Sequence, residues 1–418
     1  MKIFADLHLH TKYSRATSKN MNIDFLEKYA KIKGLNLLGT GDFTHPKWFA
    51  ELKEKLKQEE TGILKSKSGM NFILQGEISL IYTQGRGRRV HVILLAPNFA
   101  IAEQITEYLK TKGRVDYDGR PIFKIPLPEL TEKLMSISKE IMIIPAHCMT
   151  PWFGILGSES GFDSVQEAFQ DQVKNIFALE TGLSADPAML WRLSSLDKFA
   201  FISNSDSHSY WPWRLGRETN VFNFNKLTYK DFINSIKEKD SKKFLYTIEV
   251  DPAFGKYHYD GHRACNINYS PSETKKHKGI CPVCKKGLTI GVESRIEQLA
   301  DREMGFKPKN AIPFKSVIPL SEVIASCLNV QASSKKVMAE FNNLINKFDN
   351  EFNILLDVPE QELEKVCSKD ISKMILLNRE GKLKIIPGYD GVYGQLLKPG
   401  EIVEKKLIKK VQKSLDEY

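Results

Sequence analysis

The sequence predicts an α/β fold in which a barrel precedes a small metal-binding module and a mainly helical C-terminal region. Three observations support this order. Short apolar runs alternate with amphipathic stretches up to about residue 250, a Cys- and His-rich segment follows at 251–300, and helical patterns dominate 301–418. We expect three domains with these bounds, because 418 residues are more than one compact core usually holds.

The strands of the first domain, 1–250, are predicted from nearly continuous apolar runs, which are typical of parallel strands buried on both faces. They are Ile3–Ala5, Leu35–Leu38, Phe72–Leu74, Val92–Ala96, Ile141–Ile144, Ile176–Leu179 and Phe199–Ile202. Helical patterns lie between or after them, at Ile23–Lys33, Pro46–Lys57, Leu130–Lys139 and Tyr229–Lys237. Seven strands with interleaved helices favour a barrel. An open doubly wound sheet is the alternative, but no GxGxxG motif follows the first strand.

The third domain is predicted to contain helices at Ser321–Val330, Ser334–Phe348 and Glu360–Leu377. A Gly- and Pro-rich stretch, IIPGYDGVYGQLLKPG at 385–400, interrupts the helical pattern. Its backbone N–H groups are suited to a phosphate, so Tyr389 and Tyr393 are candidate DNA contacts.

The charge favours a polyanionic partner. Of the formal net charge of +10, the segment from Lys256 to Lys286 contributes seven Lys/Arg minus two acids, or five. No apolar run approaches the roughly 18–20 residues that cross a bilayer, and Met1–His10 does not look like a secretion signal. We expect a cytoplasmic protein that does not bind membranes.

Residues that bind metals follow one predicted strand after another. His8 and His10 end the first strand, where alternate residues point to the same side. Later strands are followed by Asp42 with His45, Glu77, His147, Glu180, and Asp206 with His208. Because the carboxyl ends of barrel strands gather catalytic groups, this repetition predicts a polynuclear metal site.

The motifs Asp6-Leu-His8-Leu-His10-Thr-x-x-Ser14, Gly41-Asp42, Glu77, His91, His147 and Asp206-Ser-His208 resemble those of the PHP (polymerase and histidinol phosphatase) superfamily. The resemblance covers about residues 1–250 and implies a distorted seven-stranded barrel with two or three divalent ions. It implies one ion at His8, His10, Glu77 and Asp206, a second at Glu77, His91 and His147, and a third at Asp42 and His208. Glu77 would bridge the first two ions.

The chain departs from the fullest form of that pattern after His10, where Ser14-Arg15-Ala16 replaces a further His or Asp. A weak third ion, no third ion, or a site completed by His45 are the alternatives, and Arg15 is a candidate to hold a phosphate with its planar guanidinium. His91 precedes its apolar run, which indicates that its strand enters the site from the opposite direction. Glu180 is expected to support a ligand or face the substrate.

Imidazole and carboxylate ligands suit Zn²⁺ or Mn²⁺, with Mg²⁺ as a further alternative. Paired ions produce a bound hydroxide and neutralise charge on phosphorus. No Ser or Cys stands out as a nucleophile, so we expect attack by water, with Glu77, Asp206 and Arg15 as the catalytic candidates.

A second metal motif is His262-x2-Cys265 followed by Cys281-x2-Cys284, which predicts one structural zinc ion. His258 and His277 are alternatives for the first ligand. The module would present Lys275, Lys276 and Lys278 to an acidic partner, unless these lysines form only a solvated surface.

Two aromatic loops adjoin the expected barrel site. Trp152, Phe153 and Gly154 follow His147, and Trp211, Trp213 and Arg214 follow His208. Aromatic rings on loops can stack on an extruded base, although such rings also serve as core residues.

Taken over its whole length, the chain resembles the endonuclease Q family of DNA repair enzymes. The resemblance implies hydrolysis of the phosphodiester 5′ to uracil, hypoxanthine, xanthine or an abasic site. A small-molecule phosphatase of the PHP superfamily and a non-catalytic DNA-binding adaptor are the alternatives. Gln412-x-x-Leu415-x-x-Tyr418 also faintly resembles a sliding-clamp-binding peptide.

Overall fold

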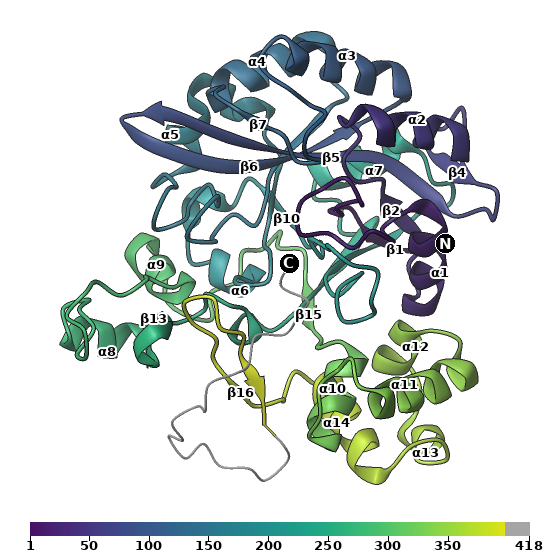
Figure 1. The fold of residues 1–418 in the computed structure, drawn as a ribbon, viewed down its shortest axis with the longest axis vertical. Helices are drawn as coiled ribbons and strands as arrows, with labels where there is room; N and C mark the ends of the chain where they lie inside the picture. The colour runs from purple at the N-terminus through teal and green to yellow at the C-terminus, as the bar shows by residue number, and fades with distance from the viewer. Residues whose placement is uncertain (398–418) are drawn as a thin grey trace.

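The computed structural model describes residues 1–397 and shows a mixed α/β fold (Figure 1). Its main sheet has the order β15-β12-β11-β1-β2-β5-β4-β3, with β6 and β7 paired to β5 and β8 paired to β6. These strands are β1 (Lys2–Asp6), β2 (Leu37–Gly39), β3 (Leu56–Gln58), β4 (Leu64–Ser66), β5 (Asn71–Gln84), β6 (Arg86–Ala96), β7 (Ile122–Phe123), β8 (Met142–Pro145), β11 (Thr219–Asn223), β12 (Phe244–Glu249) and β15 (Phe314–Ser316). A separate parallel pair is formed by β9 (Ala178–Glu180) and β10 (Ala200–Ile202).

Each of the seven predicted apolar runs lies in or overlaps a strand, but the pairing is mixed. β1, β2 and β5 are parallel, whereas β6 is antiparallel to both β5 and β8. The cause is a tight turn at Gly85 (φ 70°), which returns the chain directly along β5 and therefore permits only antiparallel pairing. His91 thus enters the site against the direction of β5, as its position before the apolar run indicated.

Hydrogen-bonded strand ladders do not close a seven-stranded barrel within residues 1–397, because β9 and β10 pair only with each other. Single hydrogen bonds connect the two sheets instead, such as that from the Cys148 N–H to the Glu180 carbonyl oxygen at 2.8 Å. The Asn220 amide on β11 donates to the carbonyl oxygens of Ala5 (3.3 Å) and Ser203 (2.7 Å). β11 and β12 were not predicted, since buried polar residues such as Thr219 and Asn220 interrupt their apolar pattern.

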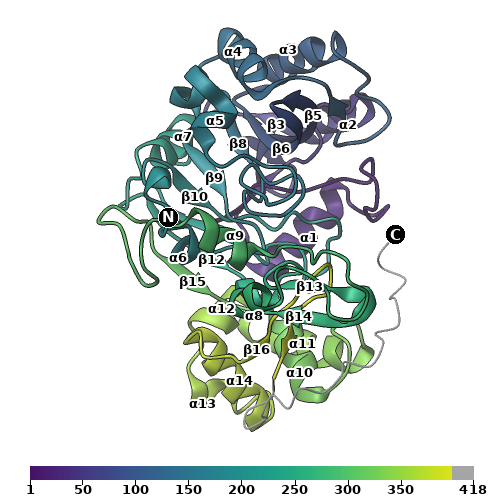
Figure 2. The ribbon, with the colours of Figure 1, turned by 90° about the vertical axis from the view of Figure 1, so that its left-hand side faces the viewer.

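Helices cover the sheet (Figures 1 and 2). They are α1 (Ile23–Lys33), α2 (Pro46–Lys55), α3 (Phe99–Lys110), α4 (Leu127–Ile137), α5 (Val165–Phe169), α6 (Pro187–Leu190) and α7 (Tyr229–Lys237). The bounds predicted for α1 and α7 are confirmed. Asn22 caps the first turn of α1 by accepting from the Phe25 N–H, and Gly34 ends the helix in the left-handed region (φ 96°).

The following segment contains β13 (Asp260–His262), β14 (Ile267–Tyr269), α8 (Pro271–Lys276) and α9 (Val292–Leu299). It is followed by α10 (Leu320–Leu328), α11 (Lys335–Phe348), α12 (Glu351–Leu356), α13 (Glu360–Leu363), α14 (Lys369–Arg379), β16 (Ile385–Ile386) and β17 (Gln395–Leu396). The prediction of one continuous helix at 360–377 is wrong. It is split because α13 ends at Leu363 and the Ser368 side chain caps a new helix through the Ile371 N–H.

No helix within residues 1–397 is long and apolar enough to span a bilayer. The clamp-like peptide at Gln412, Leu415 and Tyr418 lies outside the described residues.

A buried ion pair joins α1 to the C-terminal helices. Lys33 Nζ donates to Glu351 Oε1 and to the Pro212 carbonyl, both at 2.8 Å, and Lys33 and Glu351 are at most 1% exposed. Glu351 Oε1 also accepts from the Leu320 N–H at 2.9 Å. The pair therefore connects four segments: α1, α10, α12 and the loop that carries Trp211 and Trp213.

Lys33→Met is expected to lower the free energy of unfolding by about 3–5 kcal/mol, because it leaves the Glu351 carboxylate buried without its counterion. Urea denaturation measures this change. Lys55→Met, which removes the exposed partner of Asp24, is the control and should cost less than about 1 kcal/mol. Equal small losses in both variants would show that the buried pair does not join the segments.

Candidate metal centre

Four predicted ligands from three parts of the sheet converge on one point. His8 and His10 follow β1, Glu77 lies on β5 and Asp206 follows β10, and one ligand atom of each belongs to a single group. His10 Nε2 lies 3.1 Å from Glu77 Oε2 and 3.2 Å from Asp206 Oδ1. The corresponding distances from His8 Nε2 are 3.5 and 3.6 Å.

A second group forms on the other oxygen of the same carboxylate. Glu77 Oε1 lies 3.0 Å from His91 Nδ1 and 3.4 Å from His147 Nε2, and these two nitrogens are 3.2 Å apart. Glu77 therefore faces one group with each oxygen, which is the arrangement of a carboxylate that bridges two ions.

The chemistry of these atoms fits divalent cations. His8 Nε2, His10 Nε2, Glu77 Oε1 and Asp206 Oδ1 are buried and have no hydrogen-bond partner within residues 1–397. Leaving such atoms unsatisfied is costly, and a cation would satisfy them together. Ligand atoms held at about 2.1 Å from one ion lie about 3.0–3.4 Å apart, close to the separations observed here.

The carboxylates remain ionised despite burial. Burial alone would raise the pKa of Glu77, but His91, Arg120 and His8 hold it well below its usual value. The pKa of Asp206 is also well below its usual value, because His8, His10 and His208 outweigh the effect of burial. Both carboxylates are therefore in the anionic form that a divalent cation binds.

Glu180 orients the first ligands without joining either group. Its carboxylate lies 3.0 Å from His8 Nδ1 and accepts from the His147 N–H at 2.8 Å and the Asn204 amide at 2.9 Å. These contacts direct His8 Nε2 toward the centre, as outer carboxylates do in metal sites. The structure thus favours the supporting role among the alternatives for Glu180.

Asp42 has a similar supporting position, which differs from the third-ion prediction. Its Oδ1 lies 3.2 Å from His10 Nδ1, and its Oδ2 accepts from the Thr11 N–H (2.7 Å), the Thr11 hydroxyl (2.6 Å) and the Ser14 hydroxyl (2.8 Å). With both oxygens engaged, Asp42 orients His10 and joins no ligand group within residues 1–397.

Of the other two candidates for a third ion, His208 borders the first ligand group, with its Nδ1 3.8 Å from Asp206 Oδ1. The His208 ring lies against His10 with centroids 4.3 Å apart, and burial lowers its pKa to about 4. His45 stacks on Tyr13 at 4.4 Å. Neither residue belongs to a ligand group in the described chain.

Three residues at this centre have a strained backbone. Asp42, His147 and Asp206 have φ values of 41°, 31° and 46°, in the left-handed region that residues with side chains rarely adopt. Such conformations persist where the surrounding structure enforces them, and they are frequent at functional sites.

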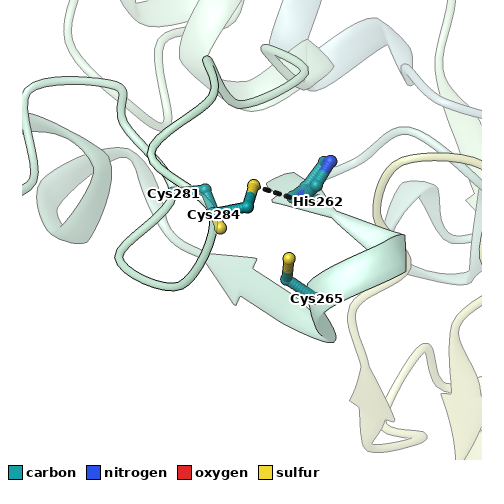
Figure 3. A group of neighbouring side chains, drawn as sticks. All are labelled: His262, Cys265, Cys281 and Cys284. Carbon is teal, nitrogen blue, oxygen red and sulfur yellow. Dashed lines mark hydrogen bonds between the residues drawn. The ribbon is translucent and has the colours of Figure 1, made fainter.

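The zinc motif also converges (Figure 3). His262 at the end of β13, Cys265, Cys281 and Cys284 form one group, with Cys284 Sγ 3.5 Å from His262 Nδ1. The alternative ligands are engaged elsewhere: His258 lies 3.6 Å from Glu293, and His277 stacks on Tyr269. Four N and S ligands without an acidic member are typical of a closed structural zinc site.

The fold has counterparts of known structure. A crystal structure of the lesion-specific endonuclease PfuEndoQ from Pyrococcus furiosus matches with a TM-score of 0.86 and 34% identity, covering 96% of each chain. The chain belongs to the endonuclease Q family. The resemblance seen over the whole sequence is thereby confirmed.

A structure of endonuclease Q with a 27-mer duplex carrying an abasic lesion also matches this family member, with a TM-score of 0.86, 33% identity and 99% coverage of both chains. The protein YqxK of Bacillus subtilis is 28% identical over 94% of this chain and 99% of its own length. MJ0043 of Methanocaldococcus jannaschii is 34% identical over 259 residues, but the match spans only 32% of its length. The model of the MJ0043 C-terminal domain matches residues 319–382.

Two arginines lie beside the metal centre of this endonuclease Q family member. The Arg15 side chain is 73% exposed, and its Nε lies 3.3 Å from Asp118 Oδ2. Arg120 instead reaches Glu77 Oε2 with Nη1 at 3.1 Å. Sequence reasoning missed Arg120, because it lies in a loop between α3 and β7 that carries no metal or phosphate motif.

The aromatic loops are only partly available to a ligand. Trp152 is 37% exposed, and Phe153 covers the His91 ring at 4.2 Å. Gly154 has no room for a side chain, since a Cβ would lie 2.5 Å from the Thr150 carbonyl oxygen. Trp211 and Trp213 stack on each other at 5.2 Å, and Trp211 also packs on Tyr210.

The Gly-rich loop packs on the zinc-motif segment. Tyr389 is 3% exposed and donates to the Asn266 side chain at 2.8 Å, so it supports the loop rather than facing solvent. Tyr393 accepts from Arg214 at 3.3 Å and lies under Lys256, and nearby Arg214, Arg217 and Lys256 lower its pKa to about 8 although burial opposes this. Lys275, Lys276 and Lys278 are exposed.

Proposed function

We propose that this protein is a metal-dependent DNA repair endonuclease that cuts on the 5′ side of deaminated bases (uracil, hypoxanthine, xanthine) and abasic sites. The observation that carries the proposal is the Glu77 carboxylate, which directs one oxygen to each of two ligand groups. It is supported by family membership and by the abasic-lesion duplex bound to a relative that is 33% identical.

We further propose that residues 1–250 form a PHP-type barrel, in which β9 and β10 complete the circle through side-chain contacts such as those of Asn220. His8, His10, Glu77 and Asp206 would hold one divalent ion, and Glu77, His91 and His147 would hold another. Zn²⁺, Mn²⁺ and Mg²⁺ are the candidates. His262, Cys265, Cys281 and Cys284 would hold a structural Zn²⁺.

When bound, the barrel ions lower the pKa of a water and neutralise charge on the phosphate. The water oxygen adds to phosphorus, the P–O3′ bond breaks, and O3′ gains a proton, leaving 3′-hydroxyl and 5′-phosphate ends. Glu180 and Asp42 keep His8 and His10 directed at the centre through this step. Asp206, whose side chain is 33% exposed, would accept the proton of water.

The direct test is incubation with Mg²⁺, Mn²⁺ or Zn²⁺ and labelled duplexes that carry a single uracil, hypoxanthine, xanthine or abasic site. We expect one cut immediately 5′ to the lesion and none in the undamaged duplex. Lesion-independent cutting, or hydrolysis of only small phosphomonoesters, would refute the proposal and favour the phosphatase alternative.

Replacing Lys275, Lys276 and Lys278 with Ala tests the zinc-motif segment as a DNA contact. The slope of log affinity against log salt concentration should fall by about 3, because each lysine that neutralises a phosphate releases about one counterion. The matched control replaces exposed Lys110, Lys112 and Lys133 on or beside α3 and α4. Fluorescence anisotropy at several salt concentrations measures the slope, and equal slopes in both triple variants would exclude this contact.

A further inference from the structure

The loop between α3 and β7 places a cation at the mouth of the metal centre. Arg120 Nη1 donates to Glu77 Oε2 at 3.1 Å, and the Arg120 side chain is 27% exposed. Glu77 itself is fully buried. Arg120 therefore contacts the bridging carboxylate while part of its guanidinium remains accessible from outside.

The position of Arg120 is determined by the turn that precedes it. Asp118 Oδ1 accepts from the N–H groups of Arg120 (3.1 Å) and Arg15 (3.3 Å). The Gly119 N–H donates to the Tyr13 carbonyl oxygen at 3.0 Å. These hydrogen bonds hold residues 118–120 against the segment that follows His10.

Gly119 also closes the space beside Asp42. A Cβ at this position would lie 2.3 Å from both Asp42 Oδ2 and the Ser14 hydroxyl oxygen, so only glycine fits. Asp42 already has hydrogen-bond partners on both oxygens. Among the described residues, the two groups that share Glu77 are complete, and Asp42 with His208 does not form a third.

We propose that the barrel centre takes two ions and that Arg120 supplies a further positive charge, binding a non-bridging oxygen of the scissile phosphate. The role at a scissile phosphate rests on the proposed function. The observation that supports the role of Arg120 is its contact with Glu77 Oε2, an atom of the first ligand group. With an ion held by that oxygen, the Arg120 guanidinium would be repelled from Glu77 and would move to the oxygen of an arriving phosphate.

A guanidinium suits this task. Its planar N–H groups match the oxygens of a phosphate, and it keeps its charge at all relevant pH values. Charge grows on the phosphate oxygens as water adds to phosphorus, so a fixed cation there stabilises the transition state more than the ground state. Arg120 touches the reacting group but makes and breaks no covalent bond.

The test uses Mn²⁺-loaded protein and inorganic phosphate as the probe, measured by calorimetry. Arg120→Gln should bind phosphate about 10–100-fold more weakly, as expected for loss of a charge-assisted hydrogen bond. It should cut a lesion duplex about 100–1,000-fold more slowly in single turnover. Arg120→Lys should recover part of both. Arg114→Gln is the matched control, since Arg114 lies on the same loop, is 72% exposed and pairs with Asp116.

Elemental analysis provides a readout independent of activity. Wild type and Arg120→Gln should both carry two barrel ions in addition to one zinc. Three barrel ions in the wild type, or loss of ions in Arg120→Gln, would overturn the inference, as would phosphate binding equal to that of Arg114→Gln. If Arg120→Gln does not fold, Arg120→Lys is the test. Because lysine lacks the planar N–H pair, this variant should still bind phosphate measurably more weakly than wild type, and unchanged binding would contradict the inference.

Different results would refute the endonuclease function and the role of Arg120. Normal lesion cutting by wild type and by Arg120→Gln would refute the role of Arg120 alone. Arg120-dependent phosphate binding without DNA cutting under any of the three ions would refute the endonuclease function and leave the phosphate site in place.

Discussion

Glu77→Gln is expected to remove both barrel ions and to slow lesion cutting by about 10⁴-fold or more. The reason is that Glu77 Oε2 belongs to the group of His8, His10 and Asp206, whereas Oε1 belongs to the group of His91 and His147. An amide loses the charge that neutralises two cations and replaces one oxygen donor with a nitrogen that cannot bind them. Loss of both ions removes the means of activating water.

Metal content and single-turnover cutting measure this prediction. Glu129→Gln is the control, because it makes the same change at an exposed carboxylate that pairs with Lys112. Thermal unfolding of the metal-stripped proteins shows whether the fold is retained. A folded Glu77→Gln variant that keeps two barrel ions would contradict the bridging role.

Asp206→Asn is expected to slow cutting by about 10³-fold while DNA affinity changes by less than about threefold. Asp206 Oδ1 lies 3.2 Å from His10 Nε2, and the side chain is 33% exposed, so Asp206 would contact both a bound ion and the approaching substrate. Removing its charge weakens one ion and removes the nearest proton acceptor for water, but it leaves the DNA-binding surface unchanged.

Electrophoretic mobility shifts and single-turnover cutting separate the two effects. Asp24→Asn, at an exposed carboxylate on α1, is the control. Parallel loss of binding and cutting would indicate that Asp206 holds the DNA rather than the reacting groups. Unchanged cutting in Asp206→Asn would show that Asp206 neither holds an ion needed for cutting nor accepts the proton of water.

The repetition of an apolar strand followed by His, Asp or Glu identified most of the residues that converge. His8, His10, Glu77, His147 and Asp206 follow this pattern, whereas His91 was indicated by the resemblance to the PHP superfamily. This succeeds because strand ends are local features, and parallel strands bring their ends to one edge of the fold. The zinc motif is equally local, since its ligands lie in two short pairs.

Features set by tertiary contacts were not predictable from sequence. Asp42 follows β2 just as a ligand would, but Thr11 and Ser14 engage its oxygens. Arg120 reaches the centre only because Gly119 fits against Asp42 across a loop with no motif. β11 and β12 were not predicted, because buried polar residues interrupt their apolar pattern. Hydrogen bonds to distant parts of the chain satisfy these residues, as the Asn220 amide shows.

The central claim, that Glu77 bridges two divalent ions, is tested most directly by anomalous diffraction from crystals soaked in Mn²⁺. We expect two strong peaks on either side of the Glu77 carboxylate, one beside His8, His10 and Asp206 and one beside His91 and His147. A single peak, or two peaks that do not share Glu77, would contradict the account.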